Sequence, residues 1–341
     1  MDCCHKEVKR SWLLNKNFLT LIVLSALLAL TTVWPAFVPV RQNLWMYLRM
    51  IGWAIGLGFL LGGLLDRYVP KETISAVLAK KRKRSIFYAV MLGFLMSACS
   101  HGILALSIEL HKKGASTPVV VSFLLASPWA NLPITLMLIG FFGLKALYII
   151  LGALWIALIT GFIFQFLESK GLIETNPNTL LLHEEYSVGK DIRARLKGLR
   201  FSFINLKKDL IAIWQGVLAL ADMTLWLVVS GVILSSLAAV FIPDDLFHRY
   251  MGPTLGGLLV TLAFAAVMEV CSQGTAPIAF QIFKKTGAFG NAFVFLMAGV
   301  VTDLTAIGLL WVNIGWKTAL WIPVVTVPQV FVLGILANKL F

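Results

Sequence analysis

Charged residues are scarce in this chain. Only 13% of its 341 residues are Asp, Glu, Lys or Arg, and 59% are apolar, whereas a soluble domain has roughly 45–50% apolar residues. The apolar residues gather in runs of about 20 with few charges, the length at which a helix crosses a lipid bilayer. These runs leave no room for a sizeable soluble domain, which excludes a pump with its own nucleotide-driven motor.

Acidic residues are scarcer than basic ones. The chain has 16 Asp and Glu against 29 Lys and Arg, a formal net charge of +13. In a soluble protein this charge would suggest nucleic acid as a partner. The strongest basic run, Lys80 to Arg84, instead lies between two apolar runs, where the positive-inside rule places cytoplasmic loops. We therefore expect a lipid bilayer around the chain and no nucleic-acid partner.

Cysteines are few, and their positions do not suggest disulfides. Cys3 and Cys4 lie at the basic N-terminus, whereas Cys99 and Cys271 lie inside apolar runs. The chain also lacks the GxxxxGK[ST] and HExxH motifs, and no hydrolase motif surrounds its polar breaks. We predict no cofactor and no enzyme activity. An intramembrane enzyme that uses Cys99 or His101 stays open as a third hypothesis.

The apolar runs predict an all-α polytopic membrane protein with about eight or nine transmembrane segments. The runs are 18–34, 44–65, 85–110, 119–139, 144–167, 211–241, 254–283, 288–312 and 318–336.

The two halves of the chain repeat one another. The alignment that places CSHG at Cys99 on CSQG at Cys271 also places Asn131 on Asp303. When that alignment is offset by one further position, Gly58 falls on Gly231. Internal duplication of this kind is typical of secondary transporters, whose site lies between the repeats. We divide the chain into a basic N-terminal segment with an extra anchor helix (1–40), a first permease repeat (41–168), a cytoplasmic basic linker (169–210) and a second permease repeat (211–341).

The basic loops indicate how the repeats are oriented. If all nine runs crossed the membrane and the Lys80 to Arg84 loop were cytoplasmic, the basic linker after Glu168 would lie outside, against the positive-inside rule. One run in each half must therefore turn back. We favour the CSHG and CSQG runs, because each divides at a polar break into pieces of roughly 10 to 14 residues, the length of a re-entrant half-helix. This choice makes the repeats inverted. A turn at the SPWANLP run of each half satisfies the same parity and stays open.

The polar breaks predict an internal cavity, because broken backbone at membrane depth is tolerated only inside protein or beside a cavity. The half-helix N-termini at the breaks would favour an anionic or electron-rich group. We expect the following residues to bind substrate: Cys99, Ser100, His101, Gly102, Asn131, Cys271, Ser272, Gly274 and Thr275.

Two pairs of residues at the breaks carry more specific hypotheses. Cys99 and Cys271 would face each other as soft ligands for a thiophilic metal or metalloid. The alternative is that each is a small residue that allows tight helix packing. Glu269 and Asp303 would couple transport to protons or cations, because ionisable groups at membrane depth are costly and functional by default.

At these motifs the chain resembles the predicted-permease family that includes the ArsP organoarsenical efflux permeases and YraQ-like membrane proteins. The resemblance runs from about Trp45 to the C-terminus, through ACSHGILALSIELHKKGAS and FLLASPWANLP in the first half and MEVCSQGTAPIAFQIFKKTGAFGNAFVFLMAGVVTDLT in the second. It implies export of arsenic-containing or other thiophilic small molecules across the cytoplasmic membrane, without ATP hydrolysis by the chain itself. The chain has His101 and Gln273 where family members often have Cys and Glu.

Two functional hypotheses follow. The first is proton-coupled, secondary-active efflux of a small thiophilic solute, such as a trivalent organoarsenical or a soft metal ion. The second is a passive channel or a permease for a small organic or inorganic anion. A transporter should lose gradient-driven flux when its carboxylates are neutralised, whereas a channel should conduct without a saturable, pH-coupled cycle. The sequence leaves the substrate and the oligomeric state open, a homodimer included.

Overall fold

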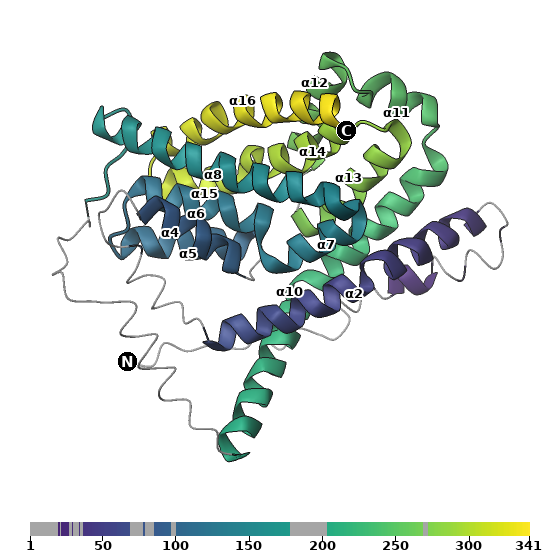
Figure 1. Ribbon diagram of the computed structural model, residues 1–341, viewed down its shortest axis with the longest axis horizontal. Coiled ribbons are helices and arrows are strands. Elements are labelled where there is room, and N and C mark those ends of the chain that lie inside the picture. The colour runs from purple at the N-terminus through teal and green to yellow at the C-terminus, as the bar shows by residue number, and fades with distance from the viewer. Residues whose placement is uncertain are drawn as a thin grey trace.

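The computed structural model describes residues 20, 22–26, 29, 34, 37–68, 78, 85–96, 100–177, 203–268 and 272–341 (Figure 1). Within these residues every regular element is a helix, as the apolar runs predict. The Lys80 to Arg84 loop and nearly all of the first apolar run lie outside the described residues.

Six α-helices and one short 3-10 helix make up the described part of the first half, and seven α-helices make up the second. The first half contains α2 (Val38–Tyr68), α4 (Ser85–Leu95), α5 (Ser100–Lys112), α6 (Thr117–Ala130), α7 (Leu132–Phe142), η3 (Gly143–Lys145) and α8 (Ala146–Ser169). The second half contains α10 (Phe203–Phe241), α11 (Asp244–Met251), α12 (Leu255–Met268), α13 (Ser272–Thr286), α14 (Phe289–Thr302), α15 (Leu304–Asn313) and α16 (Trp316–Leu340).

Both halves stack their helices in the same order. In the first half α4 packs on α6 and α6 on α8, and in the second half α12 packs on α14 and α14 on α16. Three contacts between the halves join equivalent helices, α2 to α10, α6 to α14 and α8 to α16. In Figure 1, α8 and α16 cover the upper side, and α2 and α10 cross below. The contact order therefore follows the sequence repeat.

The centre of the molecule lies at α6 and α14. Every residue of α6 is buried, and so are twelve of the fourteen residues of α14, all but Val300 and Thr302. A helix that is apolar all round is typical of the middle of a helical bundle. By contrast, α2 exposes large apolar side chains such as Trp53 and Leu60, which suits a helix that faces lipid. The layering places the two central helices where a site between the repeats would lie.

Four helical stretches among the described residues are long and apolar enough to cross a membrane. They are Val38–Leu61, Leu132–Ser169, Phe289–Asn313 and Trp316–Leu340. A fifth forms if Leu225–Phe241 and Asp244–Met251, which meet at 106°, count as one bent span. Shorter apolar helices such as Ser85–Leu95 and Leu255–Met268 account for other runs. Some of the apolar runs that the sequence predicts as single transmembrane segments are thus pairs of shorter helices.

The linker differs in extent from the expected 169–210. Helix α10 begins at Phe203, inside that range, and residues Gly171 to Asn176 lie against the helical body. The side-chain amide of Asn176 donates hydrogen bonds to the carbonyl oxygens of His111 and Ala115, at the end of α5. Within the expected linker, residues 178–202 lie outside the described residues.

Candidate functional site

One extended residue interrupts a central helix at the same place in each half. Asn131 separates α6 from α7, with φ −67° and ψ 160°. Asp303 separates α14 from α15, with φ −60° and ψ 110°. The two positions coincide in the repeat alignment that pairs Cys99 with Cys271. The breaks therefore occur where the SPWANLP motif and its repeat partner predict polar interruptions.

Local chemistry explains both breaks. The Asn131 side-chain oxygen accepts a hydrogen bond from the Ile134 N–H at 3.0 Å, which caps the start of α7. Pro133, in that first turn, has no N–H to satisfy, and its ring fits the start of a helix. In the second half an Asp303 carboxylate oxygen accepts hydrogen bonds from the N–H and the hydroxyl of Thr305, at 2.8 and 2.7 Å. Each break residue thus also begins the helix that follows.

A small cavity lies beside the break at Asp303. It has a volume of about 30 Å³, enough for roughly one water molecule. Five helices, α5, α6, α14, α15 and α16, supply its walls. The lining residues are Leu104, Leu124, Leu125, Pro128, Val300, Val301, Asp303, Ala306, Ile307, Leu310 and Ile322. Asp303 is the one ionisable residue among them.

The cavity brings together only part of the predicted site. Asp303 lines the cavity and is partly exposed. Asn131 is 2% exposed and is not one of the lining residues, although Pro128, one turn earlier, is. Leu104 and Ile307 also line the cavity, but no sequence signal marks them, because they are apolar residues within apolar runs. The predicted residues Gly102, Gly274 and Thr275 are not among the cavity walls. Among the predicted residues whose side chains the structure describes, Asp303 is therefore the one that lines the cavity.

The CSHG run is also broken, because α4 ends at Leu95 and the next residue, Met96, is not helical. Residues 97–99 and 269–271 lie outside the described residues. In the first half α4 has 11 residues and α5 has 13; in the second half α12 has 14 and α13 has 15. Helix α5 begins at Ser100 and α13 at Ser272. The described residues therefore leave both choices of re-entrant run open.

Several predicted residues fall where the structure describes no side chain. Cys99, Glu269 and Cys271 lie outside the described residues, and Ser100, His101 and Ser272 are described only as helical backbone. The facing of the two cysteines and the coupling role of Glu269 therefore stay predictions. Among the described residues, no three His, Cys, Asp or Glu side chains gather closely enough to hold a metal ion.

Gly274 has a packing role in the structure. A Cβ atom built on Gly231 of α10 would lie 1.9 Å from the Gly274 carbonyl oxygen, so the two helices touch backbone to backbone. Thr275, the next residue, is buried. Gly274 is therefore a point at which α13 contacts α10, and a larger residue there would push the two helices apart.

A carboxylate that the sequence analysis missed caps the last helix. Glu174 accepts hydrogen bonds from the N–H groups of Lys317 and Thr318, at 3.0 and 2.9 Å, and from the Thr318 hydroxyl at 2.8 Å. Partial burial alone would raise the Glu174 pKa, but these hydrogen bonds outweigh it and lower the pKa below 4.5. No sequence signal marks a contact between residues so far apart in the chain.

Comparison with known proteins supplies a family. Residues 42–220 and 209–341 match the model of a family described as predicted permease. UPF0718 protein YcgR of Bacillus subtilis (strain 168) is 27% identical over 257 residues, which cover 73% of this chain and 79% of that protein. A protein of Streptococcus mutans serotype c named "Putative two-component membrane permease complex subunit" is 20% identical over 251 residues, 73% of this chain and 78% of its own length. No solved structure matches.

Proposed function

Because the chain belongs to the predicted permease family, we propose that it carries a small solute across the cell membrane by secondary transport. The proposed solute is thiophilic, such as a trivalent organoarsenical or a soft metal ion. The proposed direction is export, and the proposed driving force is a proton that binds and leaves Asp303. A solute must enlarge the cavity before it can enter, since the cavity now holds about one water molecule.

The difference between Asn131 and Asp303 is the observation that carries this proposal. The two residues take equivalent places in the two halves, and a side-chain oxygen of each accepts a hydrogen bond from an N–H in the first turn of the following helix. Only Asp303 can ionise, and it lines a cavity whose other walls are apolar apart from backbone. A carboxylate there is costly unless it exchanges a proton or binds a cation. Helix capping alone does not require the charge, because Asn131 caps without one.

The proposal that the solute is thiophilic rests on Cys99 and Cys271. Each precedes the first residue of a half-helix, Ser100 or Ser272. A helix N-terminus stabilises a neighbouring thiolate, and thiolates are preferred ligands of soft metals and metalloids. The resemblance to organoarsenical efflux permeases supports the same class of solute.

A passive channel or an anion permease is the second candidate. The beginnings of α5 and α13 would bind an anion through backbone N–H groups without help from cysteine. This candidate predicts flux that neither saturates nor depends on a proton gradient.

An efflux assay in a sensitised bacterial host tests the proposal. The panel contains organic and inorganic arsenicals, antimony, copper and zinc, each assayed with and without a proton gradient. The first variant is Asp303→Asn, which keeps an oxygen to cap Thr305, as Asn131 caps Ile134. The control is Asp245→Asn, which neutralises an exposed carboxylate on α11.

We expect Asp303→Asn to reduce gradient-driven export at least about tenfold, because a group with no titratable proton cannot couple flux to pH. Asp245→Asn should export like the wild type. Wild-type export by Asp303→Asn over the whole pH range would show that Asp303 is structural. Flux of an anion that ignores the gradient would favour the channel.

The streptococcal relative is named as a subunit of a two-component complex. We therefore also propose that this chain assembles with a second, different membrane subunit. Co-purification from membranes in a mild detergent, followed by native mass spectrometry, would give a heteromeric mass; a monomer or a homodimer alone would contradict it.

A further inference from the structure

A cluster of phenylalanine rings fills the end of the molecule where α7 meets α13. Phe141 of α7 stacks on Phe280 of α13 with ring centroids 5.1 Å apart. Phe142 lies edge-on to Phe280 and Phe289, at 5.5 and 5.8 Å, and Phe289 lies 4.9 Å from Phe341. All but Phe341 are buried or partly buried. We call these rings, together with Phe283, the aromatic cluster.

The opposite end of the repeat has different chemistry. The alignment that pairs Cys99 with Cys271 relates the contact of α7 with α13 to the contact of α15 with α5, and it gives each ring of the aromatic cluster a counterpart in the other half. These counterparts are Asn313, Ile314, Ile108, His111, Thr117 and Ser169, none of them Phe, Tyr or Trp. The cavity lies towards this second end, because α5 and α15 supply Leu104, Ala306 and Leu310 to its walls. One end is thus sealed by rings, and the other holds the cavity.

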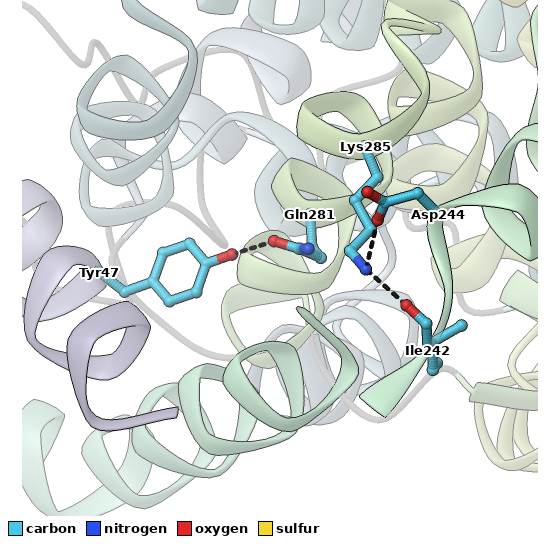
Figure 2. Close-up of polar contacts among 5 residues, drawn as sticks. All are labelled: Tyr47, Ile242, Asp244, Gln281 and Lys285. Atoms are coloured by element: carbon cyan, nitrogen blue, oxygen red, sulfur yellow. Dashed lines mark hydrogen bonds and ion pairs between the residues drawn. The ribbon is translucent and has the colours of Figure 1, made fainter. Parts of the chain in front are cut away.

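A buried polar contact joins the long helix α2 to the aromatic cluster. The Tyr47 hydroxyl donates a hydrogen bond to the side-chain oxygen of Gln281, on α13 (Figure 2). Tyr47 is 0% and Gln281 2% exposed. The Tyr47 ring also contacts Phe141 and Phe280, with centroids 6.0 and 6.1 Å apart. If these helices separated, the buried hydrogen bond between Tyr47 and Gln281 would be lost, so the contact favours the closed arrangement.

Helix α10 is held to the same end. The ammonium group of Lys285, at the end of α13, contacts the Asp244 carboxylate at 2.8 Å and the Ile242 carbonyl oxygen at 2.6 Å (Figure 2). Deeper in the molecule, Gly231 of α10 touches Gly274 of α13. The crossing pair α2 and α10 therefore closes over the aromatic cluster.

Helices α2 and α10 are equivalent in the repeat, but the helices that they contact are not. Gly58 and Gly231 are equivalent in the repeat alignment. A Cβ atom built on Gly58 would lie 2.8 Å from the Cα of Pro133, on α7, whereas Gly231 meets α13. Helices α7 and α13 form one end, so equivalent glycines approach non-equivalent helices. Exchanging the two repeats would place Gly58 against Gly102 on α5, and Gly231 against Thr305 on α15.

We propose that the aromatic cluster, latched by the Tyr47–Gln281 hydrogen bond, is the gate that closes the cavity from the side of the molecule bearing Phe341. The gate opens when α2 and α10 leave α7 and α13 for the other end. The inference rests on the proposed transport function, because only a transporter needs the cavity to open to each side in turn. It assigns Tyr47 and Gln281 as gating residues, which do not touch the solute.

A cysteine in the cavity measures which side the cavity faces. Ala306→Cys places a thiol on its wall. A membrane-impermeant methanethiosulfonate reagent is applied to each face of sealed vesicles, without any solute. Asp245→Cys marks the gate side, because α11 lies against α13 and Asp245 is exposed. The chain without an added cysteine gives the background reaction of the native cysteines.

We expect the thiol at position 306 to react from the side opposite Asp245 and hardly from the gate side. Tyr47→Phe keeps the ring and removes the hydroxyl, and Gln281→Met keeps the side-chain size and removes the amide. Each should raise the reaction rate from the gate side about tenfold, the population shift expected from losing one buried hydrogen bond. The double variant should exceed neither single variant, since both remove the same bond.

Tyr148→Phe is the matched control. Its hydroxyl donates to the Leu333 carbonyl oxygen at 2.8 Å, and its ring contacts Phe289 in the same cluster, but this bond joins α8 to α16. We expect no change in the reaction from the gate side.

Three outcomes would overturn the gate: equal reaction from both sides in the otherwise wild-type chain, reaction from neither side, or no change in both latch variants. The measurement needs no solute. A chain that exports none of the proposed solutes can therefore still pass it, and a wrong substrate is distinguishable from a wrong gate.

Discussion

Glu174 caps the first turn of α16, where its carboxylate accepts hydrogen bonds from both the N–H and the hydroxyl of Thr318. The Glu174 carbonyl oxygen in turn accepts a hydrogen bond from the Thr117 hydroxyl at 2.9 Å, at the start of α6. Glu174, which follows the first half in the chain, thus joins α6 of that half to α16 of the second half. Charge at a helix N-terminus adds to the hydrogen bonds, because the helix dipole favours an anion there.

Removing this cap should lower stability without touching the cavity. Glu174→Ala should cost about 1–2 kcal/mol, the usual cost of losing a helix cap with a charged acceptor. In detergent-purified protein the midpoint of heat unfolding should fall by a few degrees relative to the wild type. Asp245→Ala should change it less, since Asp245 is an exposed carboxylate in the first turn of α11. Equal effects of both variants would contradict a specific cap.

The same contact should make stability depend on pH in one direction. The folded pKa of Glu174 lies below the ordinary value of a glutamate, so the carboxylate stabilises the fold above the unfolded pKa and loses its effect as the pH falls through the folded pKa. The stability difference between wild type and Glu174→Gln should be constant from about pH 8 to pH 5.5 and shrink below about pH 4.5. A difference that grows on acidification would contradict the assigned hydrogen bonds.

The backbone contact between α10 and α13 gives a third prediction. Gly231→Ala should destabilise the fold by about 1–3 kcal/mol, because the new methyl group would meet the Gly274 carbonyl oxygen at 1.9 Å. Gly308→Ala is the matched control. It lies in helix α15 with nothing within 4 Å of its Cβ position, and alanine there should be neutral or stabilise by up to about 1 kcal/mol. Heat unfolding of the two purified variants measures the contrast, which equal midpoints would contradict.

Sequence patterns predict the helices and their breaks, but not which helices meet. Asn131 and Asp303 stand out in the sequence because each is polar within an apolar run, and the repeat alignment pairs them. Tyr47 and Gln281 give no such signal, because they lie in different halves of the chain and periodicity reports only which face of a helix is apolar. Phe280 is one of 23 phenylalanines in the chain. Only the packing reveals that it helps to close one end of the repeat.

The start of α10 is a boundary that charge alone does not locate. The helix begins at Phe203, before the expected end of the linker. Lys207, Lys208 and Asp209 read as linker because charge within a short window resembles a loop, whereas a helix that extends beyond the bilayer carries the same charges.

The orientation of the chain stays a prediction that labelling can test. The basic linker near Arg195 should be cytoplasmic and the loop at Asp244 and Asp245 external, because basic loops stay inside. Single cysteines at Arg195 and at Asp245, in a chain lacking the native cysteines, should react with an impermeant reagent from opposite sides of the membrane. Reaction of both from outside would contradict the inverted repeats.

The last prediction separates the chemistry of the breaks from their architecture. For a trivalent arsenical or a soft metal ion, Cys99→Ser and Cys271→Ser should each remove most of the export, because a hydroxyl keeps the size of the thiol but loses the soft ligand. For an organic anion held by backbone N–H groups, both variants should export nearly like the wild type. Gly102→Val should block either solute if the predicted cavity at the CSHG break lies on the transport path, because Gly102 lies in the first turn of α5 and valine adds a branched side chain there. One efflux assay of the three variants, with membrane insertion checked by an epitope tag, distinguishes these cases. Full export by all three would remove the beginnings of α5 and α13 from the transport path and leave Asp303 as the remaining candidate.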